Sequence, residues 1–489
     1  MIRRPAFPVG VASVVLCATG CAQLAGIEAT SGKDRPTDSL SIQRVSIGAR
    51  VVTAPLDLTG LTATFLPDGA APIAATTTAP GVWQSNLFDP APVEFTLPDP
   101  VTPTQPAFPR LFALGTAASG ATFNQLEHPA PAPAPTPASL TFNVPLDTPT
   151  TGNEGLEFYV VGAWAVRGFA AAEVPVGSAA IATTIDYATS ANLASQPQLT
   201  KITPDDALVV LRYAGPTLTG VSEATPFAQT GADTVVTPAM TAVAADQTFS
   251  ASLDPTHLSA RFSTVKPAMT GLTMSWGISA APGGMYGANA GPQLNAGAVA
   301  VTDTTITATY GNPFTAHAWP PLLTFIANET RAFTPAGQTL GASLLAQMAQ
   351  LTAPATGVTL DVQAGLANNV QINGTLLTVD GVAITKPTAP AQVTFQTDDG
   401  QADLYDVQLL DLVPNAGNTA LVPRIVIAEF GRQPPFQIPA ELFQAGHNYT
   451  VRVIASVGGF PKAAAGDLQT RTLPLAQSLV DSAVFTVMP

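Results

Sequence analysis

The stretch FQAGHNYTVRVIA, from Phe443 to Ala455, decides the fold of the C-terminal part of the chain. Every second residue from Tyr449 onward is apolar, and Thr450 and Arg452 lie between the first three of these positions. Because successive side chains of a strand point to opposite faces of a sheet, this alternation predicts a strand with one buried face.

A second strand with the same periodicity precedes it. Tyr405, Val407 and Leu409 are expected to point inward, and Asp406 and Gln408 outward. The last apolar run, at residues 483–487, predicts a further strand at the end of the chain.

These residues resemble a fibronectin type III domain. The family's corner pattern LxPGxxYxVxVxA matches residues 443–455, with Phe443 at the leucine and Ala445 at the proline, and Phe395 stands where the family usually has tryptophan. The resemblance implies a β-sandwich over residues 356–489. It also implies that Tyr449 forms a tyrosine corner, with its ring in the core and its hydroxyl on a nearby backbone group.

Short runs rich in β-branched and aromatic residues, separated by Pro, Asp and Gly, continue toward the N-terminus. We expect one β-sandwich at residues 139–246 and another at 247–355. Alternating Pro and Ala favour an extended polyproline linker at residues 119–138. The predicted fold class is therefore all-β, with several β-sandwich domains in series.

Residues 46–118 have their own family resemblance. The run LTATFLPDG from Leu61 is followed by TTTAPGVW, which ends at Trp83. This order of strands and turns resembles the transthyretin-like sandwich of carboxypeptidase regulatory modules. The resemblance implies a small β-sandwich without catalytic residues.

One segment departs from the strand pattern. Apolar residues recur at helical spacing from 340 to 351, namely at Leu340, Leu344, Leu345, Met348 and Leu351. They predict one short helix near 340–351, packed on a sandwich or, alternatively, docking a partner. Residues 257–265 and 271–280 are expected to be strands.

The N-terminus resembles the signal peptide of bacterial lipoproteins. Arg3 and Arg4 precede the apolar run VGVASVVLCATGC, which ends in small residues before Cys21. The resemblance implies that residues 1–20 are removed, that Cys21 carries lipid, and that residues 21–45 form a flexible tether. Ala22 then favours the outer membrane or cell surface. An ordinary cleaved signal and an uncleaved anchor are the alternatives.

Composition limits the partners. The formal net charge is −14, hydrophobic residues make up 46% of the chain and charged residues 11%. Nucleic acid is not an expected partner because a phosphate-binding surface needs a basic patch. With Cys17 removed and Cys21 modified, the two cysteines leave no thiol for a disulfide, a metal or catalysis.

Candidate chemistry is sparse. Asp398, Asp399, Asp403 and Asp406 cluster in the B–C loop of the fibronectin type III-like domain; they are weak calcium candidates, because their spacing is not that of an EF-hand loop. A solvated acidic loop is the favoured interpretation, so neither a metal nor a cofactor is predicted.

The remaining candidates are single residues. Ser222 lies in GVSEA, a poor match to a nucleophile elbow, and none of the four histidines has a second ligand at metal-binding spacing. The four tryptophans are sugar-stacking candidates, for which core packing is favoured: Trp83, Trp164, Trp276 and Trp319.

These observations predict a non-enzymatic, membrane-anchored surface lipoprotein that scaffolds or binds an unknown protein or glycan partner. A polysaccharide-directed hydrolase or its accessory subunit, and a calcium-stabilised adhesin, remain as alternatives. Paired carboxylates in one cleft would favour the hydrolase.

Overall fold

The computed structural model describes residues 38–67, 71–87, 91–98, 109–114, 121–126, 139–161, 165–186, 205–225, 234–282, 291–335, 337–398, 402–415, 417–459 and 472–489. Regular structure in these residues is almost entirely strand. The exceptions are one α-helix, α3 (Pro255–Phe262), and the 3-10 helices η2 (Pro313–His317) and η3 (Ala440–Leu442). The strands pair into several mostly antiparallel sheets, which confirms the predicted all-β fold of several sandwiches.

The N-terminal sandwich has two sheets around a core that contains Trp83, Phe65 and Phe95. One sheet has the order β2-β1-β6-β5, with β9 beside β1. Its strands are β1 (Ser39–Ile47), β2 (Val51–Pro55), β5 (Thr76–Ala79), β6 (Val82–Gln84) and β9 (Ala121–Leu126). The strands of the other sheet are β3 (Ala63–Phe65), β4 (Ile73–Ala74), β7 (Val93–Pro98) and β8 (Pro109–Leu114).

The second sandwich encloses a cluster of phenylalanines, in which the rings of Phe142 and Phe158 lie 5.1 Å apart. One sheet has the order β13-β10-β16 and the other β12-β11-β14-β15-β17. The strands are β10 (Ser139–Pro145), β11 (Glu154–Val160), β12 (Ala165–Gly168), β13 (Ala180–Asp186), β14 (Leu208–Ala214), β15 (Thr217–Ala224), β16 (Thr234–Val236) and β17 (Thr241–Ala242).

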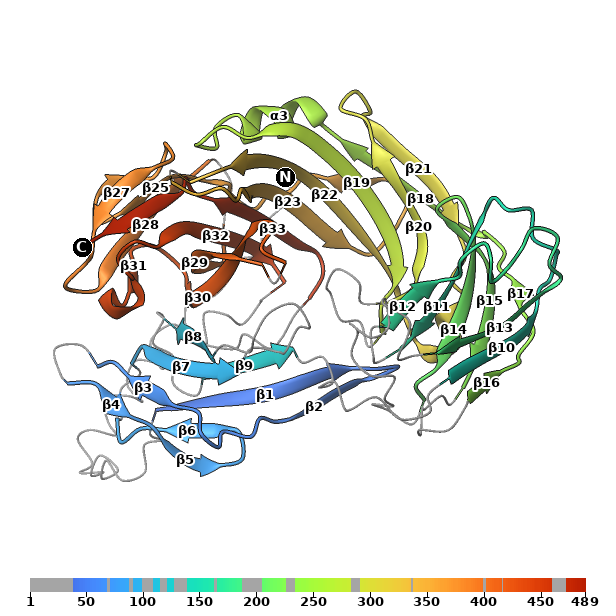
Figure 1. Cartoon of the computed structure of the whole chain (residues 1–489), viewed down its shortest axis with the longest axis horizontal. Coiled ribbons are helices and arrows are strands. Elements are labelled where there is room, and N and C mark those ends of the chain that lie inside the picture. The colour runs from blue at the N-terminus through green and yellow to red at the C-terminus, as the bar shows by residue number, and fades with distance from the viewer. Residues whose placement is uncertain are drawn as a thin grey trace, which may run out of the picture.

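The central sandwich packs the sheet β21-β18-β24 against the run β20-β19-β22-β23 of a larger sheet. Helix α3 follows β18 (Figure 1). The strands are β18 (Gln247–Leu253), β19 (Thr270–Ala280), β20 (Gln293–Val299), β21 (Thr305–Tyr310), β22 (Pro321–Phe333), β23 (Ala342–Thr352) and β24 (Val358–Leu360).

The C-terminal sandwich pairs the sheet β26-β25-β28-β31 with the run β33-β32-β29-β30. Strand β34 lies beside β32 and, in parallel, beside β27. The strands are β25 (Ala367–Ile372), β26 (Thr375–Leu376), β27 (Val382–Thr385), β28 (Ala391–Thr397), β29 (Leu404–Pro414), β30 (Leu421–Gly431), β31 (Phe436–Ile438), β32 (Asn448–Gly458), β33 (Leu475–Asp481) and β34 (Phe485–Met488).

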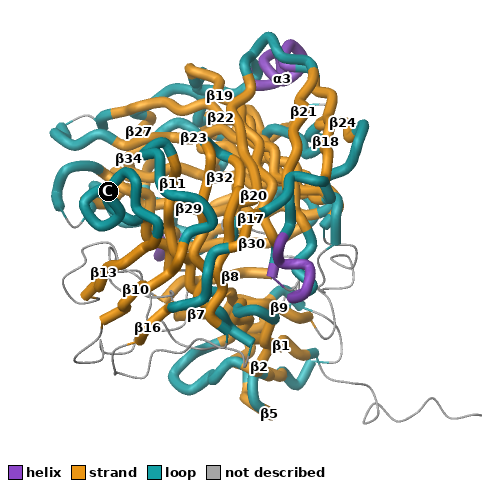
Figure 2. The backbone as a smooth tube through the Cα atoms, turned by 90° about the vertical axis from the view of Figure 1, so that its right-hand side faces the viewer, coloured by secondary structure: helices purple, strands orange, loops and turns teal. Residues whose placement is uncertain are grey.

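One sheet of 14 strands runs through three of these sandwiches. Strand β23 pairs antiparallel with β33, and β30 pairs in parallel with β8. The path is β20-β19-β22-β23-β33-β32-β29-β30-β8-β7-β3-β4, and it crosses the sequence boundaries expected near 118 and 355. Backbone hydrogen bonds therefore fasten the sandwiches to one another, and Figure 2 shows the long central strands side by side.

The N-terminal sandwich closes this arrangement into a ring (Figure 1). Strand β8 joins it to the C-terminal sandwich, and the tip of the β1–β2 hairpin reaches the other two sandwiches. At that tip the buried Ala49 donates its N–H to Asp206 at 2.6 Å, and its carbonyl accepts the indole N–H of Trp319 at 2.8 Å. The four sandwiches thus form one closed frame.

The helix predicted near 340–351 is wrong, because these residues form strand β23 and its approach. Leu344 and Met348 are four residues apart, a spacing that fits both a helix turn and one face of a strand. In the structure Leu344, Ala346 and Met348 share the buried face of β23, which lies between β22 and β33. Pairing with two neighbouring strands outweighs the local helical pattern.

The strand predicted at residues 257–265 is also wrong, because α3 occupies this segment. Asp254 caps the helix by accepting the N–H of His257, and Pro255 stands in the first turn. Leu258, Arg261 and Phe262 are buried at helical spacing. Tyr405, Val407 and Leu409 lie in the core, and Gln408 lies on the opposite face of β29, as predicted. That face is covered too, since Gln408 is 7% exposed.

Several predictions fall on other parts of the chain. The signal peptide at 1–20, Cys21 and most of the tether at 21–45 lie outside the described residues, as does most of the linker at 119–138. Strand β1 begins at Ser39, inside the expected tether, and β9 lies inside the expected linker. None of the helices in the described residues has the length and apolarity needed to cross a membrane.

Candidate functional site

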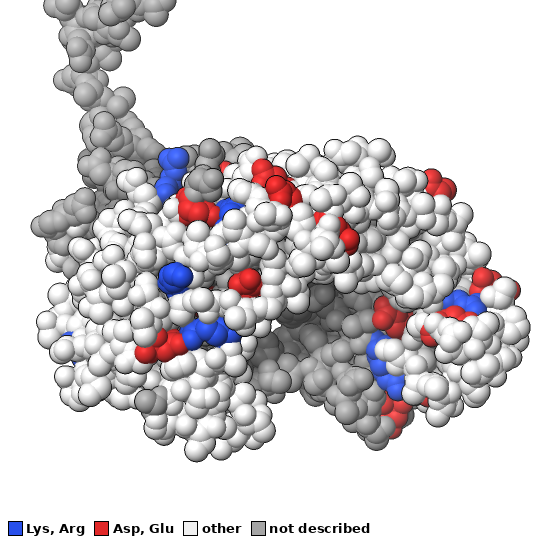
Figure 3. Space-filling model, turned by 90° about the horizontal axis from the view of Figure 1, so that it is seen from above, with Lys and Arg blue, Asp and Glu red and all other residues white. Residues whose placement is uncertain are grey.

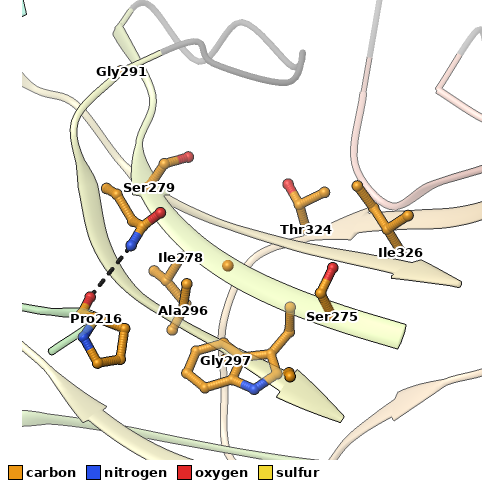
Figure 4. A pocket seen from close by; sticks show the side chains of 13 residues that line it. Pro216, Ser275, Ile278, Ser279, Gly291, Ala296, Gly297, Thr324 and Ile326 are labelled. Atoms are coloured by element: carbon orange, nitrogen blue, oxygen red, sulfur yellow. Dashed lines mark hydrogen bonds between the residues drawn. The ribbon is translucent and has the colours of Figure 1, made fainter. Parts of the chain in front are cut away.

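A shallow hollow of about 660 Å³ lies on the central sheet, over β19, β20 and β22 (Figure 4). It is open to solvent on the face opposite the central core. Its lining consists of Pro216, Ser275, Trp276, Gly277, Ile278, Ser279, Gly291, Gln293, Ala296, Gly297, Ala298, Thr324 and Ile326.

The alternation of β19 explains this surface. Met274, Trp276 and Ile278 are buried in the core, so the intervening side chains point the other way. These intervening residues are small, namely Ser275 and Ser279 on either side of Gly277. A sheet face with such small side chains leaves space above it.

The strand register places Gly277 at the centre of the hollow. It lies opposite Ala296 on β20 and opposite Thr324 on β22. A Cβ atom added at Gly277 would meet nothing closer than 3.9 Å, so the space above this residue is open. Ser275 lies opposite Ile326 in the neighbouring row.

The rim of the hollow comes from a different sandwich. Pro216, in the turn between β14 and β15, accepts a hydrogen bond from the side-chain amide of Gln293 at 3.3 Å. The hydroxyl of Tyr213 donates to the backbone oxygen of Gln293 at 3.1 Å. The hollow therefore lies where the second and central sandwiches meet, and its shape depends on their contact.

The three described tryptophans pack in the hydrophobic cores. The indole of Trp276 packs 5.4 Å from the ring of Phe249, and its side chain is 8% exposed. Trp83 and Trp319 are 2% and 1% exposed, which confirms core packing for these three. Trp164 lies outside the described residues.

The lining of the hollow contains no ionisable side chain among the described residues. Charged side chains elsewhere are gathered in small groups of opposite sign, and Figure 3 shows several of these on a largely uncharged face. Several largely buried arginines hold internal contacts, as in the pairs Arg212–Glu154, Arg261–Asp398 and Arg452–Asp481. These charges tie strands and sandwiches together.

The predicted acidic cluster is divided among different partners. Asp398 binds the guanidinium of Arg261 at 2.6 Å, and Asp403 accepts the N–H of Gly458 at 2.8 Å. Asp406 accepts the side-chain amide of Gln408 at 2.8 Å. Asp399 lies outside the described residues, within which no group of three or more metal-ligating side chains is found.

Burial changes the acidity of two carboxyl groups. Burial raises the pKa of Asp406 to about 7, although Gln408 and Arg452 act in the opposite direction. Burial also raises the pKa of Glu429 to about 8; the N–H of Gln437 opposes this change, and repulsion from Glu94 adds to it.

Glu94 and Glu429 are two carboxylates that the strand register brings near each other. Both lie in register with Ala113, Glu94 on β7 and Glu429 on β30, so they face each other across β8. Glu429 is 6% exposed, and neither Glu94 nor Glu429 lines the hollow over Gly277. The pair therefore belongs to the junction of two sandwiches.

Two histidines have partners that lie far away in the sequence. His317 lies 2.7 Å from the carboxylate of Glu223, and His447 lies 3.2 Å from that of Asp411. Ser222, the weak nucleophile candidate, is 2% exposed on strand β15 and donates to the carbonyl of Pro238. Its position in a strand excludes the sharp strand-to-helix turn of a nucleophile elbow.

Tyr449 has the contacts expected of a tyrosine corner. Its ring is 1% exposed and stacks on Phe485 at 5.8 Å. Its hydroxyl accepts the N–H of Gln444 at 2.9 Å and donates to the carbonyl of Leu442 at 3.2 Å. This side chain fixes the turn that leads into β32.

Sequence reasoning did not find the hollow. The signal lies in TMSWGISA, where small residues occupy every second position between large apolar ones. The sequence does not indicate that β20 and β22 place Ala296 and Thr324 beside Gly277. No protein-family model matches the chain, and no curated protein gives a significant match to it.

Proposed function

We propose that this chain is a non-enzymatic lipoprotein, held at the outer membrane or cell surface by a lipid on Cys21. It acts there as a rigid scaffold that carries a binding site for a protein or glycan partner. The observation that carries the proposal is the hollow over Gly277, whose described lining is free of ionisable groups.

An uncharged lining favours binding over catalysis. General acid–base catalysis needs a titratable group within reach of the substrate, and a hydroxyl nucleophile needs a base beside it. Ser275, Ser279 and Thr324 supply hydroxyls to the hollow, but its described lining supplies no base.

The closed frame supports the scaffold role. The sheet shared by three sandwiches and the contacts of Ala49 hold the hollow in a fixed geometry. Strand β19, which carries Gly277, is paired with β20 on one side and β22 on the other, so it needs little ordering when a ligand binds. This lowers the entropic cost of binding.

We also propose that residues 356–489 are a fibronectin type III-like domain. The sheets β25-β28-β31 and β33-β32-β29-β30, together with the contacts of Tyr449, support this assignment. For residues 46–118, the transthyretin-like assignment is supported by the two-sheet core around Trp83.

Fatty-acid labelling tests the anchoring. The wild type, Cys21→Ser and Cys17→Ser would be produced in a Gram-negative host fed with an alkyne-tagged palmitate. We expect label and membrane retention for the wild type and Cys17→Ser, and loss of both for Cys21→Ser. Persistent label on Cys21→Ser, or an unlabelled wild type in the cytosol, would refute the anchor.

A further inference from the structure

We propose that the hollow over Gly277 binds a neutral oligosaccharide. This inference rests on the proposed function and chooses between its two classes of partner. It is argued from the hydrogen-bonding groups, the shape and the charge of the hollow.

The hollow presents hydroxyl groups that are not engaged by other described residues. The side-chain hydroxyls of Ser275, Ser279 and Thr324 line it and have no hydrogen-bond partner among the described residues. Elsewhere in the fold threonine hydroxyls pair across strands, as Thr141 and Thr184 do at 3.0 Å. Hydroxyl groups donate and accept, and so complement a ligand that carries many hydroxyls of its own.

The shape suits a small polar chain. Gly277 forms the floor, and apolar atoms of Ala296, Ala298 and Ile326 lie around it. These atoms can contact the C–H groups of a sugar ring while the hydroxyls bind its edge. A volume of about 660 Å³ falls within the ~300–1,000 Å³ typical of sites for small ligands.

The charge of the hollow selects a neutral ligand. Its described lining has no arginine or lysine to compensate an anionic sugar and no carboxylate to hold a cationic one. The chain as a whole carries a net charge of −14, which disfavours the approach of anions at low salt.

A protein partner fits this surface less well. Protein interfaces draw most of their binding energy from buried aromatic and arginine anchors. The one aromatic residue in the described lining is Trp276, and its side chain is already packed in the core.

Three variants distinguish the hollow from the rest of the frame. Gly277→Leu fills the floor, and its Cβ would make ordinary contacts only. Gly168→Leu is the matched control, because Gly168 is also a strand glycine and a Cβ there would meet only a carbonyl oxygen at 3.8 Å. Ser279→Ala removes one hydroxyl and adds no volume, so it tests the site even if Gly277→Leu fails to fold.

The experiment is isothermal titration calorimetry of the detergent-solubilised full chain. The probes are neutral gluco-, manno- and xylo-oligosaccharides, an anionic galacturonate oligosaccharide and a mixture of uncharged peptides. We expect at least one neutral sugar to bind, the anionic sugar not to bind, and Gly277→Leu to weaken binding at least about tenfold. Gly168→Leu should bind as the wild type does, and Ser279→Ala should bind more weakly.

Three results would overturn the inference. The first is that no neutral sugar binds, and the second is that Gly277→Leu and Ser279→Ala bind the sugar as tightly as the wild type does. The third is that the anionic sugar binds more tightly than the neutral sugars. Peptide binding that depends on Gly277 would also overturn it, but would leave the scaffold proposal standing. Failure of the proposed lipid anchor would appear separately, as a wild type that takes up no palmitate label.

Discussion

Trp319 donates its indole N–H to the carbonyl oxygen of Ala49, a residue 270 positions earlier in the chain, at a distance of 2.8 Å. Both residues are buried, and Ala49 also donates its own N–H to Asp206. The tip of the β1–β2 hairpin thus touches the second and central sandwiches at once. This contact closes the frame on the side opposite the β8–β30 pairing.

Gly48→Ala tests the closure at the hairpin tip. A Cβ at Gly48 would lie 2.4 Å from a carboxylate oxygen of Asp206, so the tip must move and its buried hydrogen bonds weaken. We expect a loss of about 1–3 kcal/mol in the free energy of unfolding. Gly168→Ala, at an open position, is the control for chemical denaturation and should change little. Equal stability of the two variants would show that the tip does not hold the frame.

Glu429 should make stability depend on pH. The pKa of Glu429 is raised from 4.5 to about 8 in the folded chain. Its contribution to the free energy of unfolding is therefore fully present below pH 4.5 and is lost as the pH rises through 8. Each tenfold change in proton affinity corresponds to about 1.4 kcal/mol, so we expect a decline on the order of 3 kcal/mol from pH 5 to pH 9.

Glu429→Gln isolates this effect, because glutamine stays neutral. In thermal unfolding from pH 5 to pH 9, the variant should lose less stability than the wild type. Glu441→Gln, at an exposed position near Glu94, should follow the wild type closely. Parallel pH curves for the wild type and Glu429→Gln would contradict the assignment.

Arg261 and Asp398 hold α3 on the C-terminal sandwich. The guanidinium of Arg261 contacts Asp398 and the carbonyls of Val362 and Ala364. Asp398→Ala would leave a buried cation without its carboxylate, and we expect it to cost about 3–5 kcal/mol in the free energy of unfolding. An unchanged denaturation midpoint would show that the ion pair contributes nothing.

Chelation tests the calcium alternative separately. Asp398, Asp403 and Asp406 are already bound to protein groups, so we expect the melting temperature to be the same with and without EDTA. A fall of several degrees on chelation, reversed by added calcium, would instead favour a calcium-stabilised adhesin.

Tyr449→Phe removes a hydroxyl that both accepts and donates a hydrogen bond. We expect it to cost about 1–3 kcal/mol, because the N–H of Gln444 and the carbonyl of Leu442 lose their partner. Tyr405→Phe, in the same sandwich, removes a hydroxyl that contacts the side chain of Thr397 and, among the described residues, no backbone group of a turn; it serves as the comparison in equilibrium denaturation. The proposed corner would be wrong if Tyr449→Phe were the more stable of the two.

The strand content of this chain was predictable because alternation is a local property. The residues around Tyr449 and Val451 show it clearly, and the structure has β32 there. Local signals predicted the wrong element where the spacing fits both a helix and a strand, as between Leu344 and Met348. They also did so at α3, where the helix start depends on the capping residue Asp254.

The joining of the sandwiches was not predictable. The pairing of β23 with β33 brings together residues more than a hundred positions apart, such as Ala346 and Val480. The hollow has the same origin, because Gly277 becomes a floor only when β20 and β22 flank it. Such contacts depend on register between distant strands, which the alternation of a single strand does not encode.

Mass spectrometry of the N-terminal peptide from membrane-extracted protein tests the central claim most directly. The account predicts that the mature chain begins at Cys21 and that this residue carries the mass of attached acyl chains. An unmodified chain that begins at Met1 and is recovered from the cytosol would contradict it.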